Sequence, residues 1–175
     1  MMMPGSLAAL LERERVSVWY SVPTALVHLS LRGDLESRDL SALRWVLFAG
    51  ETFPEKHVRR IMQQLPGARF SHVYGSTEVN VCTCYPIPRT GEIADPLPIG
   101  TACSTSGTLV VDDQLRPVSK GDVGELLVRG ATVMSGYWAD PERNRQVLVR
   151  SSKTCPVSST ARSARTGAPS AAPST

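Results

Sequence analysis

The chain has 175 residues, of which 42% are hydrophobic and 20% are charged, and its formal net charge is +3. This length suffices for one globular domain with a real hydrophobic core. No apolar run reaches the roughly 18 residues that a membrane-spanning helix requires, and basic residues do not cluster with aromatic ones. The composition therefore argues against a membrane-spanning protein and against a nucleic-acid-binding protein.

The cysteines and the start of the chain indicate the compartment. The cysteines at positions 82, 84, 103 and 155 show no C-x-x-C spacing, which suggests a reducing environment. Residues 1–4 lack the basic region and apolar core that begin a secretory signal. We therefore expect a cytoplasmic protein. Cys82 and Cys84 share one face of the strand expected there, and we interpret them as buried hydrophobic residues in preference to metal ligands.

The first half of the chain alternates between helical and strand patterns. Residues 7–14 place leucines at a helical spacing, and residues 16–20 form the β-rich apolar run of a strand. Pro23 then fits the first turn of a helix that we expect through about Leu31. Residues 44–48 are typical of a buried strand.

A second helix and a third strand follow the same order. The helix is expected to start near Pro54, because apolar residues after it lie on one helical face. Residues 70–74 form the next strand. Strand–helix–strand repeats at this spacing imply an α/β fold, in which helices flank a parallel sheet. Such sheets bind ligands at the carboxyl ends of their strands.

The pattern changes to strands alone after residue 96. Residues 107–113 and 124–130 read as short strands with turns between them, which predicts the beginning of a small antiparallel β-barrel. Asp140 is placed to cap a further helix. We expect an α/β part at residues 1–96, a β-barrel-like subdomain at 97–150 and a disordered tail at 151–175.

The tail differs from the rest of the chain in composition. Residues 151–175 are rich in Ser, Thr, Ala and Pro and contain no aromatic and no acidic residue. Such a segment buries too little apolar surface to offset the entropy lost on ordering, so we expect disorder.

Residues 74–78 carry the most informative motif, Tyr-Gly-Ser-Thr-Glu. An aromatic ring can stack on a base, a glycine lets the backbone approach a ligand, and a carboxylate can hold Mg²⁺. The threonine hydroxyl can bind a phosphate oxygen. Each residue also has a structural interpretation, since a tyrosine at a strand end usually packs and a glutamate after threonine usually caps a helix.

Three further segments accompany this motif. Residues 14–24 read as a strand and then a helix, and residues 49–51 are Ala-Gly-Glu. Residues 124–130 are Gly-Glu-Leu-Leu-Val-Arg-Gly, followed at 135–138 by Ser-Gly-Tyr-Trp. With these segments the chain resembles the adenylate-forming superfamily, specifically the amino-acid adenylation domains of non-ribosomal peptide synthesis and their free-standing relatives.

The resemblance implies an enzyme that activates an amino-acid carboxylate with ATP and Mg²⁺. The acyl group then passes to the thiol of a phosphopantetheinyl carrier protein. By this resemblance Tyr74 stacks on adenine, Thr77 contacts the α-phosphate and Glu78 binds Mg²⁺. The expected cofactor-binding residues are Gly50, Glu51, Tyr74, Gly75 and Ser76, and the expected catalytic residues are Thr77 and Glu78. Ser76 stands where the family usually has proline.

In this family, side chains that line a pocket select the substrate. The matching positions are small or apolar, apart from the hydroxyl of the tyrosine: Tyr20, Leu47, Ala49, Val73, Val81 and Cys82. Burying an unpaired charge among such side chains is costly. The predicted substrate is therefore a small or medium apolar amino acid, such as proline, valine or leucine.

The resemblance also implies parts that this sequence does not show. They are a glycine-rich phosphate loop, an acidic anchor for the substrate's amino group and a C-terminal lid with a catalytic lysine. Residues 105–108 imitate the phosphate loop but lack its second glycine and its lysine. We therefore expect an internal fragment of a much longer domain, inactive alone.

The family's Arg-Thr-Gly-Asp-like motif is incomplete in this chain. Residues 165–167 are Arg-Thr-Gly, but Ala168 follows in place of the aspartate. We hypothesise a frameshift near Arg150, with a genuine flexible linker as the alternative.

Two other functions stay open at this point. One is an acyl- or aryl-CoA ligase fragment of the same superfamily. The other is a non-catalytic nucleotide-binding module that retains Tyr74 and Glu78, which weak ATP binding without pyrophosphate exchange would favour.

Overall fold

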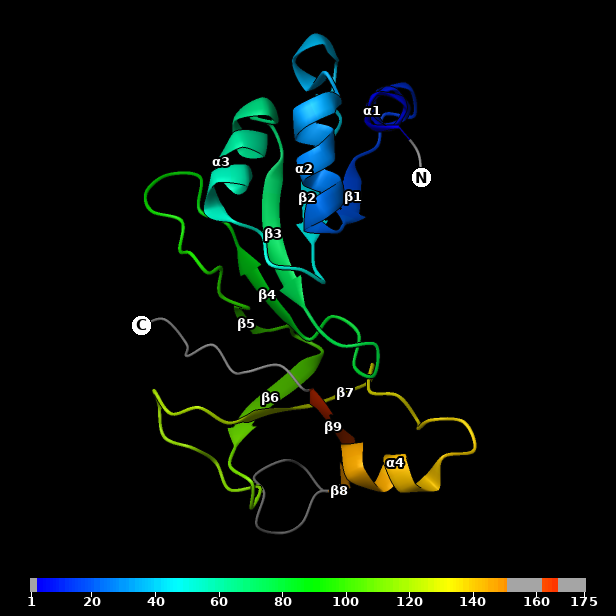
Figure 1. Cartoon of the computed structure of the whole chain (residues 1–175), viewed down its shortest axis with the longest axis vertical. Helices are drawn as coiled ribbons and strands as arrows, with labels where there is room; N and C mark the ends of the chain where they lie inside the picture. The colour runs from blue at the N-terminus through cyan, green and yellow to red at the C-terminus, as the bar shows by residue number, and fades with distance from the viewer. Residues whose placement is uncertain (1–2, 151–161, 167–175) are drawn as a thin grey trace. The chain divides into compact units, whose positions relative to one another are not determined.

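The computed structural model describes residues 3–150 and 162–166. Its contacts divide the chain into two units (Figure 1). The first unit comprises Met1–Val73 and Tyr85–Pro98, and the second comprises Tyr74–Cys84 and Ile99–Thr175. The expected division at residue 96 stays a prediction. None of the helices in the described residues is long and apolar enough to cross a membrane.

Prolines begin the helices of the first unit. Helix α1 (Pro4–Arg13) and helix α2 (Pro23–Arg32) each have proline in their first turn, where the missing N–H is not needed. Pro54 is the N-cap residue of helix α3 (Glu55–Gln64). A short 3₁₀ helix, η1 (Leu35–Ser37), follows α2. The helix starts predicted at Pro23 and near Pro54 are therefore confirmed.

Three parallel strands form the sheet of the first unit. They are β1 (Val18–Ser21), β2 (Trp45–Phe48) and β3 (Arg69–Tyr74), and the last residue of β3 belongs to the second unit. Strand β2 pairs in parallel with both of the others. The complete sheet has the order β1-β2-β3-β4-β5, in which β4 (Thr83–Pro86) and β5 (Thr101–Ala102) pair antiparallel. The predicted α/β class with a parallel sheet and flanking helices is confirmed.

The hydrophobic core of the first unit lies between this sheet and its helices. Val46, Phe48 and Phe70 are buried there against residues of α2 and α3 such as Leu26 and Ile61. Side chains that alternate with these along the strands point to the opposite face. Val18, Tyr20 and Trp45 on that face are 50%, 57% and 42% exposed.

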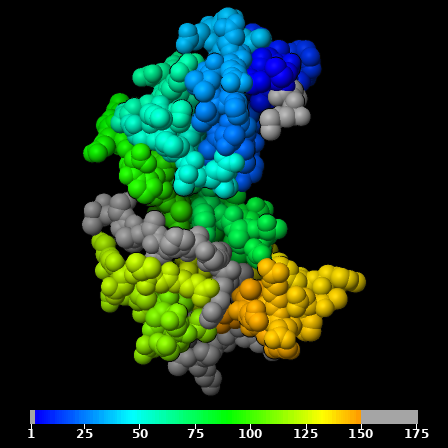
Figure 2. Space-filling view, in the orientation of Figure 1, coloured from blue at the N-terminus to red at the C-terminus, as the bar shows by residue number. Residues whose placement is uncertain are grey.

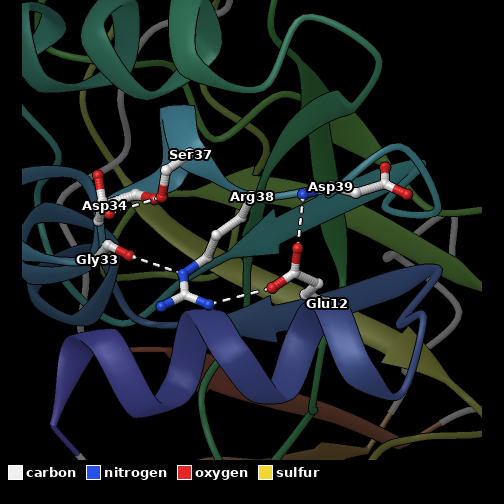
Figure 3. Close-up of polar contacts among 6 residues, drawn as sticks. All are labelled: Glu12, Gly33, Asp34, Ser37, Arg38 and Asp39. Carbon is white, nitrogen blue, oxygen red and sulfur yellow. Dashed lines mark hydrogen bonds and ion pairs between the residues drawn. The ribbon is translucent and has the colours of Figure 1, made fainter.

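Polar contacts fasten the end of α1 to the segment that follows α2 (Figure 3). The Glu12 carboxylate accepts hydrogen bonds from Arg38 Nη1 at 3.1 Å and from the Asp39 backbone N–H at 2.8 Å. Arg38 Nε also donates to the Gly33 carbonyl, 3.3 Å away. One partly buried carboxylate therefore holds the loop after α2 against α1.

The second unit contains a four-stranded antiparallel sheet with the order β6-β7-β9-β8. Its strands are β6 (Ser106–Val111), β7 (Glu125–Gly130), β8 (Leu148–Arg150) and β9 (Arg162–Thr166). The last helix, α4 (Pro141–Val147), begins after Asp140, whose side chain accepts a hydrogen bond from the Arg143 backbone N–H. Asp140 is thus the predicted cap.

Strand β9 lies within the segment that we expected to be disordered. Residues 162–166 pair with both β7 and β8 through the backbone. Backbone pairing at an otherwise open strand edge needs no apolar sequence, so composition does not reveal it. The rest of the expected tail lies outside the described residues, and so does the hypothesised frameshift region beyond Arg150.

Candidate functional site

The motif at residues 74–78 forms a tight turn between β3 and β4. The backbone N–H of Asn80 donates to the Ser76 carbonyl, and that of Cys82 donates to the Tyr74 carbonyl, each at 2.8 Å. A Cβ atom at Gly75 would overlap the Asn80 carbonyl oxygen, so this position requires glycine. Backbone hydrogen bonds therefore hold this turn together without using its side chains.

The side chains of this turn differ in exposure. Gly75 and Thr77 are exposed, whereas Tyr74, Ser76 and Glu78 are partly buried. The Ser76 hydroxyl oxygen is buried and has no hydrogen-bond partner among the described residues. The exposed Thr77 hydroxyl is suited to bind a phosphate oxygen of a ligand, whereas the buried Ser76 hydroxyl faces the protein.

Glu78 is bound at both its side chain and its backbone. The Tyr137 hydroxyl donates to Glu78 Oε1 at 2.5 Å, and the Met134 backbone N–H donates to the Glu78 carbonyl at 2.8 Å. The Tyr137 hydrogen bond is the largest cause that lowers the pKa of Glu78, and Ser76 and the Arg143 charge act in the same direction. The same hydrogen bond raises the pKa of Tyr137. Glu78 is therefore a carboxylate at neutral pH.

Tyr137 is itself held by two residues of α4. Asn144 Oδ1 accepts a hydrogen bond from the Tyr137 backbone N–H at 2.6 Å, and Asn144 Nδ2 donates to the Tyr137 carbonyl at 3.0 Å. The Arg143 guanidinium lies over the Tyr137 ring, 4.7 Å from its centroid. Residues before and within α4, yellow to orange in Figure 2, lie at the surface of the second unit.

The predicted site residues Gly50 and Glu51 lie in the first unit, after β2. Gly50 has a φ of +92°, which favours glycine. Glu51 Oε2 accepts hydrogen bonds from the backbone N–H and the hydroxyl of Thr24, at 2.9 and 2.5 Å. These bonds lower the pKa of Glu51. Because Thr24 lies in the first turn of α2, the Glu51 carboxylate stabilises a helix start, and only its backbone remains for the predicted ligand contact.

The six predicted pocket residues are divided between the units. In the first unit, Tyr20 pairs in register with Leu47, and both lie on the open face of the sheet. Ala49 and Val73 are buried. The second unit contains the remaining two, Val81 and Cys82.

Cys82 is completely buried and packs with Val79, Leu126 and Val128 in the core of the second unit. A separate pocket of about 210 Å³ in the first unit lies near the starts of α2 and α3 and is lined by none of the six. The role of these residues in substrate selection stays a prediction.

Sequence reasoning missed the side chain that contacts Glu78. Tyr137 was recognised only as part of the segment at 135–138, and it is 59 positions from Glu78. No local pattern signals a contact across that separation. Within the described residues, no group of three or more His, Cys, Asp or Glu side chains is arranged to hold a metal ion.

Comparison with known families identifies the chain. The model of the family described as AMP-binding enzyme matches residues 1–138. The chain belongs to the AMP-binding enzyme family. The chain is 43% identical over 140 residues to the L-proline–[L-prolyl-carrier protein] ligase of Streptomyces coelicolor. The matched region covers 78% of this chain and 26% of that ligase. A ligase of the same name from Pseudomonas fluorescens is 39% identical over 79% of the chain and 28% of its own length.

Solved structures agree with this assignment. The non-ribosomal peptide synthetase FmoA3 superposes with a TM-score of 0.80 at 31% identity, over 94% of this chain and 17% of that one. PA1221, described as containing adenylation and PCP domains, superposes with a TM-score of 0.81 at 25% identity, over 95% of this chain and 33% of that one. The chain thus spans about a quarter of the length of the two curated ligases that it matches.

Proposed function

We propose that this chain is the part of an ATP-dependent ligase that binds nucleotide and substrate during activation of an amino-acid carboxylate as an acyl-adenylate. The acceptor of the acyl group is a carrier-protein thiol. The observation that carries the proposal is the Glu78 carboxylate, which accepts a hydrogen bond from the Tyr137 hydroxyl and directly follows the exposed Thr77 hydroxyl. Its relatives named L-proline–[L-prolyl-carrier protein] ligase support the same function.

The residues of the turn fit the parts of ATP. Tyr74 offers an aromatic ring for the adenine base, and Thr77 offers an exposed hydroxyl for the α-phosphate. The expected role of Gly50 and Glu51 in binding the cofactor stays a prediction.

Glu78 fits Mg²⁺, which proteins usually bind through one or two carboxylates together with substrate phosphates. An ion held by Glu78 would supply positive charge that stabilises the pyrophosphate leaving group. Glu78 contributes a negative charge next to Thr77, where the phosphates of the nucleotide would lie. Thr77 orients the α-phosphate, so the chain's own contribution is positioning and charge stabilisation.

The proposed substrate is L-proline or another small apolar amino acid. Of the six predicted pocket residues, five are small or apolar, and none introduces a charge. The two ligases named above act on L-proline by their names. A charged substrate side chain would lose hydration without gaining a partner from these residues.

The test is a chimaera in which this chain's family-matched segment replaces the aligned segment of the Streptomyces coelicolor ligase. The chimaera is assayed for ATP–pyrophosphate exchange with a panel of amino acids. We expect exchange with proline that is lost in the Glu78→Ala form. Transfer to a carrier protein, with coenzyme A offered in parallel, then identifies the acceptor.

Three outcomes of this assay would contradict parts of the proposal. A folded chimaera without exchange would refute the activating function. Exchange that prefers aspartate or lysine would refute the apolar substrate. Transfer to coenzyme A alone would favour the CoA ligase alternative.

A further inference from the structure

Residues 134–144, which we call the brace, contact Glu78 at two points. The Met134 backbone N–H binds the Glu78 carbonyl at 2.8 Å, and the Tyr137 hydroxyl binds Glu78 Oε1 at 2.5 Å. The first bond fixes the backbone of Glu78, and the second fixes the orientation of its carboxylate. All these residues belong to the second unit.

The brace is built so that Tyr137 has little freedom. Asn144 binds both the N–H and the carbonyl of Tyr137, and Arg143 covers the tyrosine ring. Gly136 has a φ of +146°, and a Cβ atom there would come within 3.0 Å of the Asn144 amide oxygen. A side chain at residue 136 would therefore crowd the Asn144 amide that holds Tyr137.

A phenylalanine at position 137 would place the same ring there without the hydroxyl. The hydroxyl adds a hydrogen bond to a carboxylate, which is stronger than a bond between neutral groups. A glutamate side chain has three rotatable bonds, and Mg²⁺ demands near-ideal octahedral geometry from its ligands. Removing a group that orients a metal ligand typically costs about 10–100-fold in metal affinity or activity.

We propose that Tyr137 is a positioning residue, which holds the Glu78 carboxylate in the orientation that binds the divalent cation of the nucleotide, and that Asn144 acts through Tyr137. This inference rests on the proposed function, because it takes Glu78 as the cation ligand. It assigns to the brace a role in cation binding.

The test uses the complete 175-residue chain and measures ATP binding by calorimetry, once with Mg²⁺ and once with EDTA. We expect Tyr137→Phe to weaken binding of Mg·ATP about tenfold and to leave binding of metal-free ATP unchanged. Asn144→Ala is expected to act in the same direction. Tyr85→Phe is the matched control, since Tyr85 packs against the core of the first unit and should leave both affinities unchanged.

A double-mutant cycle identifies the route of the effect. Glu78→Gln removes the carboxylate charge, and adding Tyr137→Phe to it should cause no further loss of Mg·ATP affinity. A full additional loss in the double variant would overturn the inference, because Tyr137 would then act independently of Glu78. Circular dichroism of each variant establishes that the fold is retained.

The remaining outcomes separate this inference from the proposed function. If Glu78→Gln weakens Mg·ATP binding and Tyr137→Phe does not, the positioning role is refuted and the proposed function stands. Equal weakening of Mg·ATP and metal-free ATP by Tyr137→Phe would show a merely structural role. If the chain binds ATP equally with and without Mg²⁺, both the metal role of Glu78 and the positioning role are refuted.

Discussion

Two glutamate side chains make the same type of hydrogen bond, but one stabilises the fold and the other belongs to the candidate site. Glu51 and Glu78 both follow strands, and both accept a hydrogen bond from a hydroxyl group at 2.5 Å. The partner of Glu51 is Thr24 in the first turn of a helix, whereas the partner of Glu78 is a tyrosine on another loop. The sequence alone predicts two similar acidic residues, and only the identity of the partner separates a helix-stabilising carboxylate from a candidate cation ligand.

His72 provides a prediction on pH dependence. Its Nδ1 donates to the Pro98 carbonyl at 2.8 Å, and its ring stacks on Phe48 with centroids 5.4 Å apart. Burial is the largest cause of its shift and lowers the pKa of His72 below 6.5, although the Pro98 contact acts in the opposite direction. Below pH 6.5 the unfolded chain therefore binds a proton more readily than the folded chain does.

The free energy of unfolding should consequently fall as the pH decreases from 6.5 toward the lower pKa of the folded state, and level off below it. Replacing His72 by Phe keeps an aromatic ring against Phe48 and removes this contribution. Urea unfolding of both proteins between about pH 7.5 and about pH 5.5 should show a smaller loss of stability in the variant. Equal losses would refute the assignment.

At the scale of elements, much of the first unit was predictable because its signals are local. Pro23 and Pro54 mark helix starts, and the apolar runs at 44–48 and 70–74 lie in strands whose bounds differ from the expected ones by one residue at most. Strand β5 has only two residues, both exposed, and β9 contains no apolar residue larger than alanine. Backbone pairing with neighbouring strands defines such strands, and no local sequence pattern indicates that pairing.

The same distinction explains the candidate site. The turn at residues 74–78 was predicted from its own residue types, because Gly75 and its polar neighbours lie together in the sequence. The support that Tyr137 and Asn144 give to Glu78 depends on how the chain returns from the second sheet. That return is a tertiary property, so the motif at 135–138 indicated a family resemblance without indicating a contact.

The contact between α1 and the loop after α2 gives a prediction for the elements of the first unit (Figure 3). Glu12→Ala leaves the partly buried Arg38 guanidinium and the Asp39 N–H without their acceptor. Since both bonds involve a charged group, we expect the free energy of unfolding to fall by about 1.5–3 kcal/mol.

Urea denaturation measures this change, and Glu14→Ala is the matched control. The ion pair of Glu14 with Arg13 is exposed, so its removal should cost about 0.5 kcal/mol or less. Similar losses in the two variants would show that the Glu12 contacts add nothing beyond a surface ion pair.

At the scale of the whole molecule, the exposed face of the first unit's sheet bears on whether copies of the chain associate in solution. Val18, Tyr20 and Trp45 expose between 42% and 57% of their surface on neighbouring strands, and β1 is the edge strand of the sheet. Contiguous apolar surface next to an unpaired strand edge promotes association between copies. We therefore expect the purified chain to self-associate as its concentration rises.

Val18→Lys should shift the chain toward the monomer, because it places a charge on the edge strand within this apolar face. The shift is measured by size-exclusion chromatography with light scattering over a range of concentrations. Val123→Lys is the control, since Val123 is 78% exposed but lies in the second unit, in the segment that connects β6 and β7. If Val123→Lys reduces association as much as Val18→Lys does, added charge alone is responsible. A wild-type chain that stays monomeric at every concentration would show that the face is too small or too polar at its margins to drive association.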